Sequence, residues 1–178
     1  IRNANDGISL AQTAEGALGK VGDMLQRMRE LAVQAANGTN SSDDRTNLNE
    51  EFAQLKDEID RTLETTRFNS AAILDAGAGS LTFQVGANDG ETITVTSNNM
   101  RTNADIAAVT GSSSSIDGTD ATNANAALQA IDTALTTLNS ERATYGAIQN
   151  RFESVIANLQ VGVENQTAAR SRIMDADF

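Results

Sequence analysis

Apolar residues in the last third of the chain, Asn123 to Phe178, recur in alternating steps of three and four residues. This spacing predicts a helix that turns one narrow apolar stripe towards a partner helix. A helix of about 50 residues extends roughly 75 Å at 1.5 Å per residue, so we expect long neighbouring helices to cover the stripe. The apolar stripe positions are Leu128, Ile131, Leu135, Leu138, Tyr145, Phe152, Ile156, Leu159, Val163 and Ile173, and the polar interruptions are Arg142, Gln149, Gln166 and Arg170.

The first segment, Ala4 to Asn37, keeps the same spacing over four heptads, which favours a partner helix over an isolated surface helix. Gly38 follows Asn37 and can adopt the left-handed conformation in which many helices end. We therefore expect a long N-terminal helix within residues 1–37, antiparallel to the last helix. Its stripe is Ala4, Ala11, Ala14, Leu18, Val21, Leu25, Met28, Ala32 and Ala35.

A shorter helix is predicted over residues 43–64. Ser41, Ser42, Asp43 and Asp44 supply hydroxyls and carboxylates at its start, where such groups bond to the free backbone N–H groups or complement their charge. The stripe of this helix is Leu48, Phe52, Leu55, Ile59 and Leu63.

Beyond Phe68 the pattern changes to alternation of apolar and polar residues, seen at residues 81–85 and again at 92–96. The intervening residues 86–90 are Gly, Ala, Asn, Asp and Gly, which suit a tight turn. We predict a β-hairpin region over residues 68–110 that lies against the helices, because an isolated hairpin is marginal in water. Residues 101–109 fit another short element.

Residues 111–124 are rich in Ser and Thr and are expected to form a variable loop before the last helix, 125–178. Together the patterns predict one domain, residues 1–178. Its fold class is mainly α, an elongated antiparallel three-helix rod that is coiled-coil-like and carries a small β-hairpin region.

The charge and composition exclude several classes of partner. The 24 acidic and 13 basic residues give a net charge of −11, so we expect no nucleic-acid partner. No run approaches the roughly 18 apolar residues of a membrane span, so no membrane insertion is expected. The sequence shows no signal peptide, and because it starts with Ile1 and not with Met, we expect it to be a trimmed piece.

The sequence offers little chemistry, since it contains no Cys, His, Trp or Pro. The commonest general base, thiolate nucleophile and transition-metal ligands are therefore missing. The acidic groups lack the ligand spacing of a calcium loop, and helix capping and turns explain them better. These groups are Asp43-Asp44, Asn88-Asp89-Gly90, Asp117–Asp120 and Asp175/Asp177. Ser112–Ser115 have no base to activate them. We expect no enzyme, no cofactor and no metal site.

One surface feature has two interpretations. Arg27, Leu31 and Gln34 follow one another at steps of four and three beside the buried stripe, with Glu30 adjoining. Leu31 fits the widened edge of the core equally well as an apolar anchor in a protein interface, where Arg often flanks a desolvated residue.

Several stretches of the sequence resemble bacterial flagellin. Residues 2–9 (RNANDGIS), 12–18 (QTAEGAL) and 25–34 (LQRMRELAVQ) resemble the N-terminal rod of that family. Residues 57–61 (DEIDR) and 66–69 (TRFN) resemble its second helix and the following turn. Residues 146–152 (GAIQNRF) and 169–173 (ARSRI) resemble its C-terminal rod helix. The matches lie in order and mark regions that together cover about two-thirds of the chain. Tyr145 departs from the family pattern, which usually has Leu there.

The resemblance implies a structural subunit of the bacterial flagellar filament, with motility as its function and other flagellin subunits as partners in a homopolymer. It implies an extracellular location and export through the flagellar channel without a cleaved signal peptide, served by flagellar export and assembly factors. Flagellins continue past both ends into terminal helices that pair in the inner tube of the filament. Residues 1–178 alone are therefore expected to stay monomeric.

The resemblance also implies recognition by Toll-like receptor 5, the innate immune receptor for flagellin. The receptor-contact Arg and Leu of the family match Arg27 and Leu31, and its contact Glu on the following helix matches Glu51. Gln26, Glu30 and Gln34 lie nearby in the sequence and are further candidates.

Two alternatives to a filament subunit follow from the same residues. A flagellin-like cell-surface adhesin that binds a polysaccharide or a host ligand would use the same rod, so the sequence leaves it open. A hydrolase inserted in the variable region is disfavoured, because only about 55 residues separate Phe68 from Asn123 and neither His nor Cys is present.

Overall fold

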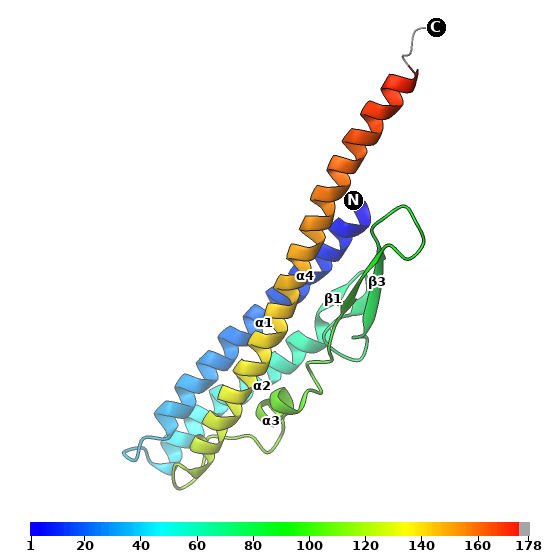
Figure 1. Cartoon of the computed structure of the whole chain (residues 1–178). Helices are drawn as coiled ribbons and strands as arrows, with labels where there is room; N and C mark the ends of the chain where they lie inside the picture. Colours follow the sequence, from blue (N-terminus) through cyan, green and yellow to red (C-terminus); the bar gives the residue numbers. More distant parts are fainter. Residues whose placement is uncertain (175–178) are drawn as a thin grey trace.

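The computed structural model describes residues 1–174 as an elongated helical bundle. Figure 1 shows the three longer helices side by side, with the strands and a short helix along one flank. The prediction of a mainly α rod with a small β-hairpin region is confirmed. The elements are α1 (Arg2–Ala35), α2 (Ser42–Thr65), β1 (Arg67–Phe68), β2 (Ala71–Ala72), β3 (Ser80–Gln84), β4 (Thr92–Thr96), α3 (Ala104–Thr110) and α4 (Thr122–Met174). The predicted end of the last helix and the Asp175/Asp177 pair lie outside the described residues.

Helices α1 and α4 pack antiparallel along the whole length of α1. Residue numbers on α4 fall as those on α1 rise, from Gly7 beside Phe152 to Gly22 beside Leu138. Two ion pairs join the same helices, Glu15 with Arg142 at 3.3 Å and Arg29 with Asp132 at 2.8 Å. All nine predicted stripe residues of α1 are fully buried in this seam, and Leu10 and Leu31 widen it.

Between Leu128 and Phe152, the predicted stripe of α4 is correct at every second position and wrong at the others. Beyond Phe152, Ile156 and Leu159 are half-buried and Val163 and Ile173 are exposed. Ile131, Leu138, Tyr145 and Phe152 are buried, as expected. The positions between them are occupied by Ala127, Ala134, Glu141 and Ile148, each one residue before the predicted Leu128, Leu135, Arg142 and Gln149. Small side chains let the two helices approach closely, so Ala occupies the seam while the neighbouring Leu residues lie half-buried at its edge.

Glycine in α1 allows this close approach at the end of the seam. A Cβ atom on Gly7 would lie 2.3 Å from Cζ of the fully buried Phe152, so the phenyl ring occupies the space that a side chain would need. Because Gly7 has no side chain, the Phe152 ring can pack directly against the backbone of α1 at this end of the α1–α4 contact.

The turn between α1 and α2 is fixed by side chains at the start of α2. Ser41 and Asp44 form a capping box, in which Asp44 N–H donates to Ser41 Oγ at 3.2 Å and Ser41 N–H donates to Asp44 Oδ2 at 3.0 Å. The expected capping role of these residues is confirmed.

Arg45 is buried and donates to the backbone oxygens of Ala35 at 2.9 Å and Asn37 at 3.2 Å, which lie at the end of α1. A buried cation therefore satisfies the free carbonyls of that helix end.

The predicted β-hairpin is formed by β3 and β4, with Leu81 opposite Val95 and Phe83 opposite Ile93. The Phe83 and Phe152 rings meet edge to face with centroids 5.6 Å apart, so the hairpin lies against α4, as expected. A second, smaller hairpin of β1 and β2 was not predicted. Its two turn residues, Asn69 and Ser70, have φ values of +47° and +68°, which suit a two-residue turn.

The Ser/Thr-rich residues 111–121 are attached to α2, and the expectation of a plain loop is incomplete. Ile116 is fully buried, and its N–H donates to Asn49 Oδ1 at 2.9 Å. Lys56 Nζ donates to the Ser114 backbone oxygen at 2.6 Å, and the partial burial of Lys56 lowers the pKa of its ammonium group. Helix α4 begins at Thr122, three residues before the predicted start.

The last part of α4 extends beyond the start of α1, as Figure 1 shows near the two chain ends. Val161, Val163, Ile173 and Met174 are 56–75 % exposed there. Two of them, Val163 and Ile173, belong to the predicted stripe, and within residues 1–174 no helix covers them. No helix among the described residues has an apolar stretch that could cross a bilayer.

Candidate interaction surface

The structure brings Arg27 and Glu51 together from different helices. Arg27 Nε on α1 lies 2.8 Å from Glu51 Oε1 on α2, and Arg27 Nη1 lies 2.9 Å from Glu30 Oε2 one turn along α1. Gln26 and Gln34 are exposed on the same helix. Of the six residues taken from the resemblance, these five line the surface of the rod; we call Gln26, Arg27, Glu30, Gln34 and Glu51 the Arg27 surface.

The sixth residue, Leu31, is only 1 % exposed and belongs to the core. Of the two interpretations given for it, the widened edge of the core is therefore right, and an exposed apolar anchor is wrong in this structure. The physical reason is that α2 lies alongside α1 at this height, as the Arg27–Glu51 pair shows, so the side of α1 next to the stripe is covered.

The Arg27 guanidinium is a persistent positive charge held in one position. Its hydrogen bonds to Glu51 and then to Glu30 raise the pKa of Arg27 above its ordinary value. Half of its side chain is exposed, so solvent screens both pairs. Two of the five guanidinium N–H groups make these bonds, which leaves others that can face a partner.

An exposed apolar residue does lie beside the Arg27 surface, but it is Val33. Val33 is 52 % exposed and lines a shallow groove with Gln26, Arg29 and Glu30. Arg29 Nε is held by Asp132 Oδ1 of α4 at 2.8 Å, and this contact raises the pKa of Arg29. Sequence reasoning missed both residues. The available signal was that Val33 lies off the stripe, four residues after Arg29.

A second hollow continues this surface towards the α1–α2 turn. Gln34 lines it together with Asn40, Asp44, Asn47 and Leu48. The two hollows and the Arg27 surface form one polar face with few apolar residues, which suits a hydrogen-bonding protein partner better than a small apolar ligand.

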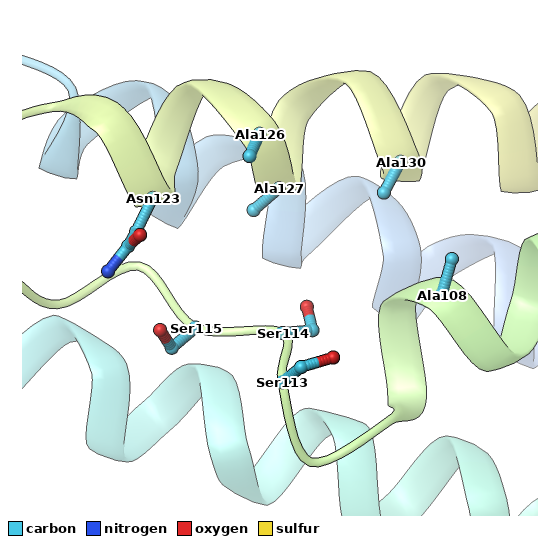
Figure 2. Close-up of a pocket in the computed structure, with 8 residues that line it drawn as sticks. All are labelled: Ala108, Ser113, Ser114, Ser115, Asn123, Ala126, Ala127 and Ala130. Atoms are coloured by element: carbon cyan, nitrogen blue, oxygen red, sulfur yellow. The ribbon is translucent and has the colours of Figure 1, made fainter.

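A further pocket lies elsewhere, between α3, the segment before α4, and α4 itself (Figure 2). Its volume is about 130 Å³. Figure 2 shows alanines of α3 and α4 around the serine side chains, with no titratable group among the labelled residues. The lining residues are Ala108, Ser113, Ser114, Ser115, Asn123, Ala126, Ala127 and Ala130. The pocket offers neither a general base nor a charged ligand to a substrate.

Several carboxylates elsewhere in the described residues are used in pairing and capping. Asp60 accepts both hydrogen bonds of a bidentate contact from Arg101, and Glu64 and Asp75 approach the same guanidinium. The contact with Asp60 raises the pKa of Arg101 above its ordinary value. Within residues 1–174 no three potential ligands converge in a way that could hold a metal ion.

Comparison with known proteins identifies both ends of the rod. The family described as the bacterial flagellin N-terminal helical region matches residues 1–78, and the bacterial flagellin C-terminal helical region matches residues 128–178. The flagellin of Halalkalibacterium halodurans is 48 % identical over 177 residues, which cover 99 % of this chain and 64 % of that protein. The flagellin of Bacillus subtilis is 40 % identical over 206 residues, which cover 99 % of this chain and 67 % of that protein.

A solved structure has the same fold. The crystal structure of Bacillus cereus flagellin matches with a TM-score of 0.77 and 35 % identity, covering 94 % of each chain. The chain thus spans about two-thirds of the length of curated relatives while matching a solved flagellin almost end to end. By sequence and by structure, this chain belongs to the bacterial flagellin family.

Proposed function

We propose that the chain is the rod of a flagellar filament subunit that acts in motility by polymerising with copies of itself outside the cell. The observation that carries this proposal is the exposed apolar surface of the last part of α4. Val163 and Met174 lie three turns apart on one face of α4 and are 56 % and 71 % exposed, and exposed apolar residues that share a helix face are typical of an assembly interface. Flagellin membership and the elongated shape support the same conclusion, and the subunit has no catalytic role.

We propose as well that the chain is exported through the flagellar channel without a cleaved signal peptide, with the help of flagellar export and assembly factors. The support for this export is the family alone.

The filament proposal is tested in a flagellin-deletion strain that expresses the full-length protein. Val163→Asp combined with Met174→Asp places two charges on the exposed apolar surface and should abolish filaments and swimming, because desolvating a carboxylate in an interface is costly. Asn165→Asp, at an exposed polar position on the opposite side of the same helix, is the matched control and should still polymerise. Electron microscopy and swimming assays give the readout.

Two outcomes of that experiment contradict the proposal. Filaments formed by the double variant would show that this surface is not an assembly interface. An unmodified full-length protein that is displayed on the cell without polymerising would favour the adhesin, binding a polysaccharide or host ligand.

We propose further that the Arg27 surface is the contact for Toll-like receptor 5. What supports it is the position-by-position family resemblance together with the fixed geometry of Arg27, Glu30 and Glu51. A charged group that is already oriented loses less conformational freedom on binding than a mobile one. Leu31 would act from beneath, by holding the backbone of this turn in place, and Val33 would supply the apolar contact.

The receptor proposal predicts that Arg27→Ala and Glu51→Ala each weaken binding to the receptor ectodomain by at least about tenfold, which corresponds to 1.4 kcal/mol. Arg61→Ala is the matched control, because Arg61 also forms an exposed pair on this rod, with Glu58, but lies outside the Arg27 surface. Circular dichroism should be unchanged in all three. If the two surface variants bind like the control, the Arg27 surface is rod surface only.

Leu31→Ala cannot carry this test, because a buried cavity lowers stability and changes the surface indirectly. Val33→Ala is the cleaner probe of an apolar contact. It should weaken receptor binding and leave the melting temperature within error of the parent, since Val33 is exposed.

A further inference from the structure

Buried polar atoms without a protein hydrogen-bond partner cluster on one stretch of α4. Among residues 1–174 there are five such side-chain atoms, and four belong to this stretch, the fifth being Ser114 Oγ. Glu141 and Tyr145 occupy seam positions, where burial and the charge of Glu141 raise the pKa of Tyr145. The four atoms are Glu141 Oε1, Arg142 Nε, Tyr145 OH and Gln149 Nε2.

Glu141 is the unusual member of this group because it places a carboxylate in a seam of apolar residues. Its side chain is 8 % exposed, and the seam positions before it on α4 are Ala, Ile and Leu. A buried carboxylate with an unpartnered oxygen lowers stability, and an apolar side chain of similar volume would pack there at no such cost. Rod stability alone therefore does not explain Glu141.

The one hydrogen bond that Glu141 makes leads to the base of the hairpin. Asn98 Nδ2 donates to Glu141 Oε2 at 2.8 Å. The preceding residue, Ser97, is buried and closes the hairpin onto Gly79. Ser97 N–H donates to the Gly79 oxygen at 2.9 Å, and Gly79 N–H donates to Ser97 Oγ at 3.2 Å. The chain of contacts thus runs from the seam through Asn98 to the point where the hairpin begins and ends.

We propose that Glu141 is a positioning residue that anchors the base of the β3–β4 hairpin to the α1–α4 seam through Asn98. The hairpin needs such an anchor, because two strands alone are marginally stable and their outer face is exposed and polar. Its apolar face meets α4 through Phe83 and Phe152, and near the turn Asn3 Nδ2 of α1 donates to the Gln84 oxygen at 2.8 Å, whereas neither contact holds the base of the hairpin. A charge-assisted hydrogen bond from Asn98 supplies that direction.

The anchor is tested by hydrogen exchange and mass spectrometry on the full chain. In Glu141→Leu and in Asn98→Ala, backbone amides of residues 92–97 should exchange about tenfold faster. This equals 1.4 kcal/mol, close to the lower end for a hydrogen bond to a charged group. Amides of α2 should keep the exchange rates of the parent. The melting temperature of Glu141→Leu should not fall, because Leu replaces a buried carboxylate in the apolar seam.

Three further variants separate anchoring from a general effect on stability. Glu141→Gln keeps an oxygen that accepts from Asn98 and should retain most of the hairpin protection. The double variant Glu141→Leu/Asn98→Ala should exchange no faster than either single variant, because both remove one contact. Thr137→Ala is the matched control, since Thr137 bonds Asp105 of α3 one turn earlier on α4 and should leave the hairpin unchanged.

Hairpin amides that exchange at the parent rate in both Glu141→Leu and Asn98→Ala would overturn the proposal. Faster exchange that extends equally to α2 would overturn it as well, because Glu141 would then act only through global stability. Should Glu141→Leu fail to fold, Asn98→Ala decides alone, as Asn98 lies outside the core.

Discussion

The two parts of α4 have similar apolar spacing and opposite surroundings. Between Ala124 and Phe152, every third or fourth residue is buried against α1. Beyond Phe152 the same helix keeps apolar residues, yet Val161 and Val163 are more than half exposed. Residues 153–174 extend about 33 Å past the end of the seam at 1.5 Å per residue. The spacing thus predicts a helix and a stripe, whereas burial depends on which partner is present.

The largest expected effect comes from truncating one apolar residue in each part. Leu138→Ala removes a side chain that is 1 % exposed and should lower the free energy of unfolding by about 2–5 kcal/mol. Val163→Ala should change it by less than about 0.5 kcal/mol, because that side chain is already in water. Urea denaturation of both variants measures the contrast.

Leu135→Ala sharpens the same comparison by testing the corrected stripe. Leu135 is half-buried beside the seam. The decrease in the free energy of unfolding caused by Leu135→Ala should therefore lie between the decreases caused by Leu138→Ala and Val163→Ala. A decrease as large as that of Leu138→Ala would mean that Leu135 lies in the seam, and the register described above would be wrong.

Gly7 provides a test at the end of the seam, just where the buried part of α4 stops. A Cβ atom there meets Phe152 at 2.3 Å, so Gly7→Ala should destabilise the rod by about 1–3 kcal/mol through overpacking, despite the helix preference of Ala. In a Phe152→Leu background the penalty should shrink. Gly16→Ala, where nothing lies near the added carbon, is the control and should not destabilise. Equal effects at the two glycines would mean that the ring does not fill this space.

The one-residue error in the stripe of α4 shows what apolar spacing can and cannot predict. Leu128 and Leu135 are the more apolar residues, so ranking by hydrophobicity selects them. The seam selects Ala127 and Ala134, because two helices that approach closely have room only for a methyl group. In α1 the stripe residues Ala11 and Ala32 also have a larger neighbour, but Leu10 and Leu31 are buried as well and widen the seam, so the predicted stripe remains correct there.

For the interaction surface, the sequence indicated residues but not their exposure. Arg27 and Glu51 are 24 positions apart, and only the family resemblance suggested that they lie together, as the 2.8 Å contact confirms. Whether Leu31 or Val33 faces water depends on where α2 and α4 cross α1, which residue spacing within α1 does not contain. The contact between Arg29 and Asp132, two residues that are 103 positions apart, could not be predicted from the sequence for the same reason.

At the opposite end of the seam, Arg45 should matter nearly as much as an apolar core residue. It is 3 % exposed and donates to the Ala35 oxygen at 2.9 Å. Arg45→Ala leaves the Ala35 carbonyl at the end of α1 without this donor, so the free energy of unfolding should drop by about 1–3 kcal/mol. Arg67→Ala, which removes an exposed Arg that bonds one backbone oxygen at 3.2 Å, serves as the control. If both variants lower the free energy of unfolding by a similar small amount, the hydrogen bonds of Arg45 to the end of α1 do not contribute to stability.

The smallest effect is expected at Asp44, which starts α2 next to that end of the seam. Hydrogen bonds from the Ser41 backbone N–H and then from its hydroxyl lower the pKa of Asp44 below its ordinary value of 3.8. A carboxyl whose pKa is lower in the folded state adds stability above its unfolded pKa, and that stability is lost as the pH falls through the folded value. The parent should therefore be slightly more stable than Asp44→Asn from pH 5 to 7, and the two should converge towards pH 2. Urea midpoints of both proteins at pH 7, 4 and 2.5 measure this convergence. A difference that stays constant over the range would mean that Asp44 caps α2 through its shape alone, with no contribution from its charge.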